Sequence, residues 1–206
     1  PLNGLRKTVA DKLATSRREI PEATTWVDVD ATALLAARAA MNATLPDTER
    51  VSLLALLARL AVAALRRYPQ LNSSVDADRR QIVQHGRVQL GIAAQTPRGL
   101  VVPMIADADA LPTVELARRL TEITALARDG KLPPARLTGG TFTLNNYGVF
   151  GVDGSAPIIN HPEAAILGIG RIIDRPWVVD GAIVVRKVAQ ISLAFDHRVC
   201  DGGEAG

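Results

Sequence analysis

The order in which helical and extended hydrophobic patterns follow one another constrains the fold of this 206-residue chain most. Apolar residues recur every three to four positions in some segments and alternate in others, which distinguishes helices from strands. The spacing predicts helices over residues 5–18, 31–41, 53–67 and 111–132, and strands over residues 24–30, 99–105, 141–144, 164–173 and 188–195. Since helices and strands do not alternate regularly, the pattern predicts a mixed β-sheet with flanking helices, within the broad α/β (α+β) class.

Two hairpins are also expected from the sequence. Residues 79–96 form a run with period-two character that is predicted to turn near His85 and Gly86. Residues 177–185 carry Asp180 and Gly181 between two apolar runs, and an Asp-Gly pair suits a two-residue hairpin turn.

Composition indicates an ordinary globular domain. Hydrophobic residues make up 48% of the chain and charged residues 22%, as in typical globular proteins. Aromatic residues make up only 3%, so Leu, Val, Ile and Ala must fill the core. Neither a tandem repeat nor a linker-like change in composition is visible, and we interpret residues 1–206 as one domain.

The same sequence argues against several cellular locations and classes of partner. A single cysteine, Cys200, cannot form a disulfide within the chain, and residues 1–13 lack a signal-peptide pattern. The longest apolar stretch, 51–65, is short for a membrane span and contains Arg59. The formal net charge of +3 comes from scattered basic residues, and nucleic-acid binding needs clustered charge or aromatic platforms. We therefore expect a soluble, cytoplasmic protein with no nucleic-acid or membrane partner.

Few side chains could carry chemistry. The ligand types His and Cys occur only at His85, His161, His197 and Cys200. Apart from His197 and Cys200, no pair has the close ligand spacing of a zinc site, so no metal is expected. Residues 152–158 do not form a serine nucleophile elbow. Cys200 is interpreted as a small buried side chain rather than a nucleophile.

His197 differs from the other two histidines in its setting. An apolar strand delivers it to a loop that continues with Asp201, Gly202 and Gly203, and functional residues often lie on loops held by a rigid scaffold. A neutral imidazole can accept a proton near neutral pH. His197 is therefore a candidate general base.

The segment "FDHRVCDGG" resembles the H-x-x-x-D-G signature of the dihydrolipoamide acyltransferases, the core components of 2-oxo acid dehydrogenase complexes, which chloramphenicol acetyltransferase shares. Four further segments are similar to that catalytic domain in the same order: "PLNGLRKTVADKLATSRREIP", "VQLGIAAQTPRGLVVPMI", "GGTFTLNNYGVFG" and "APIINHPEAAILGIGRI". The resemblance spans nearly the whole chain. It implies a chloramphenicol acetyltransferase-like, trimer-forming fold.

The resemblance implies an acyl transfer between the thiol of a lipoyl arm and the thiol of coenzyme A, with His197 as the base that deprotonates the attacking thiol. Asp201 corresponds to the motif aspartate, which in the family holds the histidine loop through an ion pair. Arg6 is our candidate for its partner, and Gly202 for the residue that lets the loop turn.

The oxyanion donor is where this sequence departs from the family pattern. The family places Ser or Thr at the third position of its T-x-(S/T)-N stretch, and this chain has Asn145 there. A side-chain amide can also donate to an oxyanion. We expect Asn145 to replace the hydroxyl; the alternative is that Asn145 is a turn residue and water or a backbone N–H does the work. Asn160 is a candidate contact for coenzyme A, with a loop-capping role as the alternative.

Further expectations follow from the resemblance. The chain corresponds to a catalytic-core fragment, without the lipoyl and subunit-binding domains or the C-terminal tail of full-length members. The lipoyl group is expected on a separate domain. Homotrimers are expected to build a larger core, as a 24-mer, that works with the decarboxylase and dihydrolipoamide dehydrogenase components. A branched-chain acyl group is favoured over acetyl or succinyl. The competing interpretations are a free-standing acetyltransferase and a catalytically weak structural core.

Overall fold

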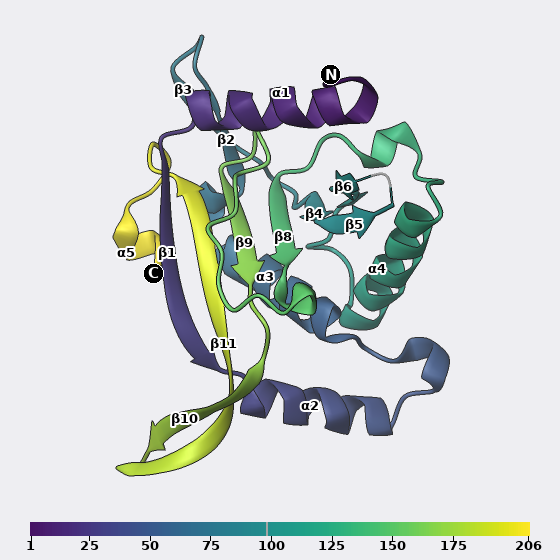
Figure 1. Cartoon of the computed structure of the whole chain (residues 1–206), viewed down its shortest axis with the longest axis vertical. Coiled ribbons are helices and arrows are strands. Elements are labelled where there is room, and N and C mark those ends of the chain that lie inside the picture. The colour runs from purple at the N-terminus through teal and green to yellow at the C-terminus, as the bar shows by residue number, and fades with distance from the viewer. Residues whose placement is uncertain (98) are drawn as a thin grey trace.

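A mixed β-sheet runs through the middle of the molecule, with helices packed around it (Figure 1). The structure, a computed structural model, describes residues 1–97 and 99–206 except for the side chain of Leu5. The helices are α1 (Gly4–Glu19), α2 (Thr32–Ala43), α3 (Leu53–Arg67), α4 (Thr113–Arg128) and α5 (Gly202–Ala205). The strands are β1 (Glu22–Asp30), β2 (Ser73–Asp76), β3 (Gln81–Gln84), β4 (Leu90–Ile92), β5 (Ala94–Thr96), β6 (Gly99–Val101), β7 (Met104–Ile105), β8 (Phe142–Asn146), β9 (Ala165–Ile169), β10 (Ile173–Val179) and β11 (Ala182–Asp196).

The main sheet combines parallel and antiparallel pairs. Its order is β1-β11-β9-β8-β4-β7, and β10 pairs with the first half of β11. Strand β8 is parallel to both β4 and β9, while the other neighbours in this sheet are antiparallel. The predicted mixed sheet with flanking helices is therefore confirmed.

The core lies between one face of the sheet and helices α3 and α4. It is almost wholly aliphatic, as the scarcity of aromatic residues requires. Buried side chains of α3 and α4 pack on the strand residues that point to that face, among them Leu90, Phe142, Leu144, Ala165 and Phe195. A smaller cluster on the opposite face joins the end of α1 to β9 and β11 through Ile20, Ile159, Ile166 and Ala194.

Helix α3 shows how local signals define an element here. The Ser52 side chain accepts a hydrogen bond from the backbone N–H of Ala55 at 3.1 Å, which satisfies a free donor at the helix start. Arg66 and Arg67 occupy the last turn, where positive charge suits the helix dipole. In the described part of the chain, no helix is both long and apolar enough to cross a membrane.

The hairpin predicted over residues 79–96 is wrong. Strand β2 pairs with β3 instead, so the turn falls between Asp76 and Gln81, and Arg80 adopts a positive φ of 53° there. Strand β4 leaves this hairpin and pairs in parallel with β8. Its partner lies about fifty residues further along the chain, and a local pattern cannot reveal such a pairing.

The second hairpin is confirmed. Asp180 and Gly181 connect β10 to β11, and both have positive φ angles, 51° and 79°. Two consecutive positive φ angles are typical of a turn that matches the twist of its strands. The hairpin extends beyond the body of the molecule, at the lower left of Figure 1.

Candidate functional site

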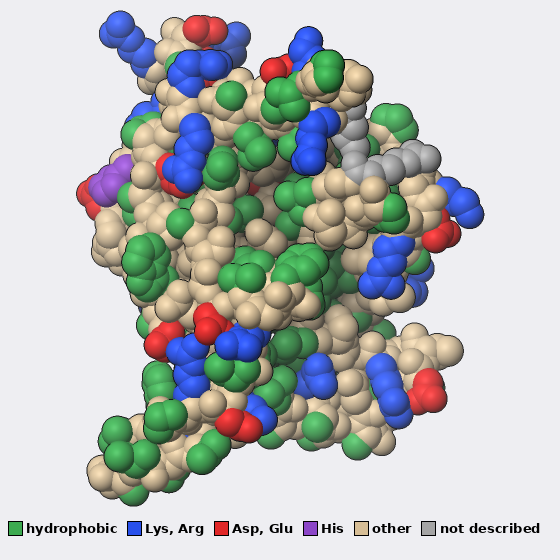
Figure 2. Space-filling model, viewed as in Figure 1, with side chains coloured by type: hydrophobic (Ala, Val, Ile, Leu, Met, Phe, Trp, Pro, Cys, Tyr) green, Lys and Arg blue, Asp and Glu red, His purple; other side chains and the backbone are tan. Residues whose placement is uncertain are grey.

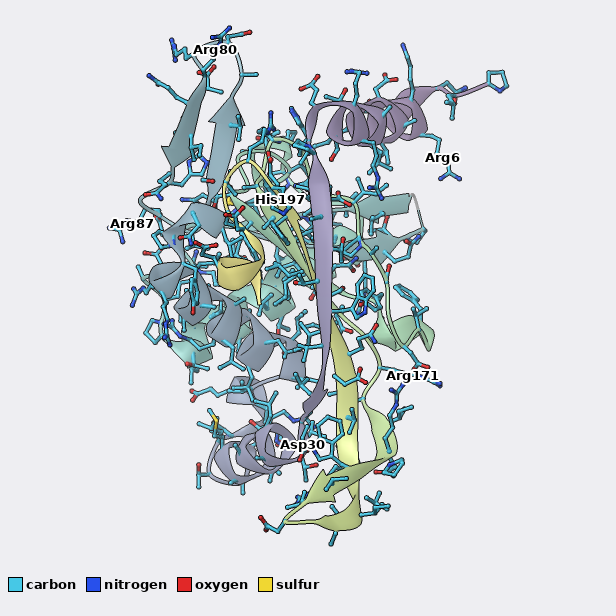
Figure 3. All side chains as sticks on the ribbon, turned by 90° about the vertical axis from the view of Figure 1, so that its left-hand side faces the viewer. Arg6, Asp30, Arg80, Arg87, Arg171 and His197 are labelled. Atoms are coloured by element: carbon cyan, nitrogen blue, oxygen red, sulfur yellow. The ribbon has the colours of Figure 1, made fainter. Side chains whose placement is uncertain are left out.

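His197 follows directly after the last residue of β11, at the end of the sheet where α1 joins β1. Its backbone N–H donates to the carbonyl of Pro21 at 3.0 Å. Its ring lies 5.4 Å from the ring of the buried Phe195, centre to centre. Half of the His197 side chain remains exposed, so the imidazole is held at its base and accessible to solvent; Figure 3 labels its position.

The loop around His197 is braced by its two neighbours in sequence. Asp196 is buried, and its Oδ1 accepts hydrogen bonds from the backbone N–H and the Nε of Arg198, both at 2.9 Å. Oδ2 accepts a third from Nη2 of Arg198 at 2.6 Å. The Asp196 backbone N–H donates to the carbonyl of Ala164 at 2.8 Å. A charge-assisted pair with two contacts restricts both partners, so it fixes the chain direction on either side of His197.

Asp201 takes a different position from the one predicted. Its Oδ1 lies 3.6 Å from Nδ1 of His197, and its side chain is 85% exposed. That separation is longer than a hydrogen bond. In a single chain, the exposed carboxylate of Asp201 therefore faces His197 without a hydrogen bond to it. It is not a buried carboxylate that needs a cation.

The predicted ion pair between Arg6 and Asp201 is wrong for a single chain. Arg6 is exposed on the first turn of α1, and no ion pair between these two side chains occurs in the described part of the chain. Helix α1 is 16 residues long, and it is its C-terminal end that meets the His197 loop. Figure 3 accordingly shows Arg6 at the far end of α1 from His197.

Gly202 is not required by the geometry of one chain. It begins α5, and a Cβ atom built on it meets nothing within 4 Å. Its predicted supporting role is therefore not seen within the chain.

Burial raises the pKa of the nearby Cys200 thiol to about 11, which keeps the thiol protonated at neutral pH and fits its interpretation as a buried packing residue.

Asp196 and Asp201 differ in burial and in hydrogen bonding, and unfolding measurements can detect the consequence. Asp196→Ala is expected to lower the free energy of unfolding by about 2–4 kcal/mol, because it leaves three donors of Arg198 without an acceptor. Asp201→Ala, the matched control, is expected to change it by less than about 1 kcal/mol, since its side chain is exposed. Urea unfolding of both variants measures the difference, and equal losses would contradict this account.

Asn145 lies near the C-terminal end of β8, opposite Gly168 of β9. Side chains two residues apart share a face of a strand, so Asn145 shares the face of Thr143. Its side chain is half-buried. In the part of the chain that the structure describes, the Asn145 amide makes no hydrogen bond, so its N–H groups are free to donate to a ligand.

His197 and Asn145 are not brought together within one chain. Gly168, the partner of Asn145, is paired in turn with Ser192 of β11, and His197 follows five residues later. Five residues of strand and two strand spacings amount to a separation on the order of 15–20 Å. A base at His197 and a donor at Asn145 of the same chain could not act on one thioester.

Asn160 is engaged within the protein. Its Nδ2 donates to Oε1 of Glu163 at 2.6 Å. Oε2 of Glu163 accepts from Oγ1 of Thr143, also at 2.6 Å, and Glu163 is only 2% exposed. This contact matches the loop-capping alternative for Asn160, while a role in binding coenzyme A stays a prediction.

The family "2-oxoacid dehydrogenases acyltransferase (catalytic domain)" matches residues 1–206. The chain belongs to this family. A lipoamide acyltransferase component of the branched-chain alpha-keto acid dehydrogenase complex of Pseudomonas aeruginosa is 41% identical to this family member over 206 residues, which are 100% of the chain and 48% of the relative. Succinyltransferase and acetyltransferase components of Haemophilus influenzae and Bacillus subtilis are each 37% identical.

Solved structures give the same result for this family member. A probable dihydrolipoamide acetyltransferase from Listeria monocytogenes has a TM-score of 0.93 and 39% identity, covering 100% of this chain and 88% of that one. The cubic core of a pyruvate dehydrogenase multienzyme complex has a TM-score of 0.92 and 32% identity, covering 100% and 85%. Chloramphenicol acetyltransferase, at 16% identity and a TM-score of 0.52, shares the fold, so the predicted fold class is confirmed. The chain spans about half the length of the curated relatives it matches.

Sequence reasoning missed the residues that hold the site. Asp196 and Arg198 flank His197 with a spacing of two, and an acid followed by a base at a strand end was the available signal. Glu163 stands in the apolar run "HPEAAILG", where a carboxyl group is conspicuous. In neither case does the sequence state which groups the side chain meets.

Proposed function

We propose that this domain transfers an acyl group between the thiol of dihydrolipoamide and the thiol of coenzyme A. The observation that carries the proposal is the setting of His197: a half-exposed imidazole, fixed at a strand end by the Asp196–Arg198 pair. Membership of the acyltransferase family supports it. Its relatives are named for acyl transfer to lipoamide or dihydrolipoyllysine.

The proton route follows from the geometry of the ring. Nδ1 of His197 faces the carboxylate of Asp201 at 3.6 Å, which favours the tautomer with the proton on Nδ1. Nε2 then holds the lone pair and takes the proton of the attacking thiol. A free thiol has a pKa of about 8.5, which is higher than that of an ordinary imidazole, so an imidazole does not remove the proton completely before attack. Proton removal and attack must therefore be concerted.

The acyl transfer itself needs no covalent enzyme intermediate. The thiol sulfur forms a bond to the thioester carbonyl carbon, and the carbonyl oxygen becomes an oxyanion. The free amide of Asn145 is proposed to donate to that oxygen. When the oxyanion collapses, the carbon–sulfur bond of the leaving thiol breaks, and that sulfur takes the proton back from the His197 imidazolium.

An acyl-transfer assay tests this proposal. The protein is incubated with dihydrolipoamide and with acetyl-, succinyl- or branched-chain acyl-CoA, and thioester formation is followed for each donor. We expect transfer, with a branched-chain donor preferred; a preference for acetyl or succinyl would assign the other specificities instead. Absence of transfer with every donor, in folded and assembled protein, would leave the structural-core alternative. Acceptance of small-molecule amines or alcohols but not of dihydrolipoamide would favour a free-standing acetyltransferase.

A site shared between subunits is part of the proposal. His197 and Asn145 of one chain are on the order of 15–20 Å apart by strand geometry, so a second copy of the chain must supply one of them. We propose a homotrimer in which His197 of one subunit and Asn145 of its neighbour face the same substrate.

The β10–β11 hairpin supports self-association. Val178, Ile183 and Val185 are 66%, 78% and 72% exposed, and Figure 2 shows hydrophobic side chains over this projecting arm. A two-stranded hairpin is only marginally stable by itself in water, and contiguous apolar surface of this kind marks protein contacts. A neighbouring subunit would cover it.

Mixed oligomers test the shared site directly. His197→Ala and Asn145→Ala chains are each expected to be nearly inactive alone. When they are co-expressed in equal amounts, about a quarter of the sites combine an intact His197 with an intact Asn145 from the neighbour, so about a quarter of wild-type activity should return. The control combines wild-type chains with the double variant. Activity no higher than that of the separate variants would contradict a shared site.

The wider assembly is proposed on the same basis. A solved relative forms the cubic core of a multienzyme complex, which supports a core of 24 subunits here. In the proposed complex, the lipoyl group is carried on a separate domain, and the decarboxylase and dihydrolipoamide dehydrogenase components are partners. A cytoplasmic location is supported by the one cysteine, which is free and buried.

A further inference from the structure

A buried glutamate that the proposed mechanism does not use lies between the strand ends that carry Asn145 and His197. Glu163 is 2% exposed, and each of its carboxyl oxygens accepts a hydrogen bond at 2.6 Å, one from Thr143 and one from Asn160. Both donors are neutral groups. No cation contacts this carboxyl group in the described part of the chain.

Glu163 meets β8 two residues before Asn145. Thr143 is fully buried, and it points to the same face of β8 as Asn145 because the two residues are separated by one position. The hydrogen bond from Thr143 to Glu163 therefore fixes the part of β8 from which Asn145 projects. Gly140, just before β8, leaves room for the carboxyl group, since a Cβ atom there would lie 2.6 Å from Oε1 of Glu163.

Glu163 also leads directly to the His197 loop. The next residue, Ala164, accepts a hydrogen bond at 2.8 Å from the backbone N–H of Asp196, and it donates to the carbonyl of Ser73 at 3.0 Å. Glu163 is thus one peptide unit from the contact that holds the end of β11. A movement of its side chain would be transmitted to the strand ends on which His197 and Asn145 lie.

We propose that Glu163 is a positioning residue: its neutral carboxyl group holds β8 and the end of β11 in register, and loss of its proton loosens both. The effect on acyl transfer rests on the proposed function, while the effect on the local structure does not.

The surroundings of Glu163 favour the neutral form. Burial raises the pKa of Glu163 to about 7, although the two hydrogen bonds and the distant charge of Lys12 on α1 act in the opposite direction. A buried carboxylate without a paired cation is unfavourable. The other titratable or charged side chains nearby are His161, which contacts Glu19 at 3.1 Å, and His85 and Arg87, which line a hollow of about 570 Å³ that Glu163 and Gly140 also border.

The sign of the pH effect follows from that direction. A carboxyl group whose pKa is higher in the folded than in the unfolded state contributes stability at low pH, and this contribution is lost as the pH rises through the folded pKa. With an unfolded pKa near 4.5 and a folded pKa of about 7, the folded-to-unfolded ratio should fall roughly 300-fold between pH 4 and pH 9 from this group alone.

Glu163→Gln provides the test, because it keeps the size and one of the two acceptor oxygens while its charge stays zero at every pH. Glu49→Gln, on the exposed segment before α3, is the matched control. We expect the wild type to lose stability relative to Glu163→Gln as the pH rises from 6 to 9. Hydrogen–deuterium exchange, corrected for the intrinsic pH dependence, should show peptides covering 142–146 and 193–198 opening over the same range in the wild type alone.

The pH profile of kcat separates positioning from general destabilisation. Glu163 should produce a loss of activity above pH 7 in the wild type, and Glu163→Gln should abolish that alkaline loss. Glu163→Ala, which removes both hydrogen bonds, should lower kcat at every pH.

Two results would overturn the proposal. One is a stability difference between wild type and Glu163→Gln that does not change with pH. The other is an alkaline loss of kcat that persists in Glu163→Gln. If the exchange and stability effects appear while no acyl transfer is detected with any donor, the local role of Glu163 is upheld and the proposed function is refuted.

Discussion

Replacing His197 with alanine is expected to lower the kcat of acyl transfer by about a hundredfold to ten-thousandfold, the range for loss of a general base. His197 is the one histidine of the three that lies directly after the end of β11. The melting temperature should change little, because half of the side chain is exposed and the loop is held by Asp196 and Arg198.

The other two histidines provide matched controls for this experiment. His85→Ala and His161→Ala remove an imidazole elsewhere, and each should keep kcat within about threefold of the wild type. Thioester formation from acyl-CoA and dihydrolipoamide measures all three variants. A His197→Ala protein that is folded, assembled and still active at more than a tenth of the wild-type rate would exclude His197 as the base.

Replacing Asn145 with alanine is expected to lower kcat by about a hundredfold or more, which is the typical effect of losing one oxyanion donor. The Asn145 amide has no partner in the described part of the chain, so the variant should keep its stability. Asn145→Ser should keep kcat within about tenfold of the wild type, because a hydroxyl can donate to the same oxyanion.

The neighbouring residue is the control for Asn145. Asn146 also ends in an amide, but its Oδ1 accepts from the backbone N–H of Gly148 at 3.1 Å, and its side chain points to the other face of β8. Asn146→Ala should therefore affect stability more than kcat. A loss of less than threefold in Asn145→Ala would remove Asn145 from the mechanism and favour a water molecule or a backbone N–H as donor.

Local interactions explain which parts of the fold could be predicted. The helices and the Asp180-Gly181 turn depend on residues within a few positions of one another, and periodicity and turn chemistry report such contacts. The hairpin over residues 79–96 failed because β4 pairs with β8, and the competing partner is remote in sequence. Strand pairing across fifty residues leaves no local signature.

The predictions for the candidate site divide in the same way, into those that depend on local spacing and those that depend on packing. The motif around His197 identified the base, because its spacing is local. The supporting residues depend on packing: Asp201 was expected to pair with Arg6, yet its side chain is 85% exposed and faces His197, while Asp196 is buried. Only burial distinguishes two aspartates that lie five residues apart.

The sequence by itself determined the main helices, the Asp180-Gly181 turn, the position of His197 at a strand end and the likeness to an acyltransferase family, since these depend on residue type and short-range spacing. The tertiary structure decided the distances between the residues of the candidate site. Pairing of β8, β9 and β11 places Asn145 and His197 far apart in one chain, and packing of Glu163 between Thr143 and Asn160 joins β8 to the segment that precedes β9. Both outcomes arise from contacts between remote segments, which depend on how the whole chain packs.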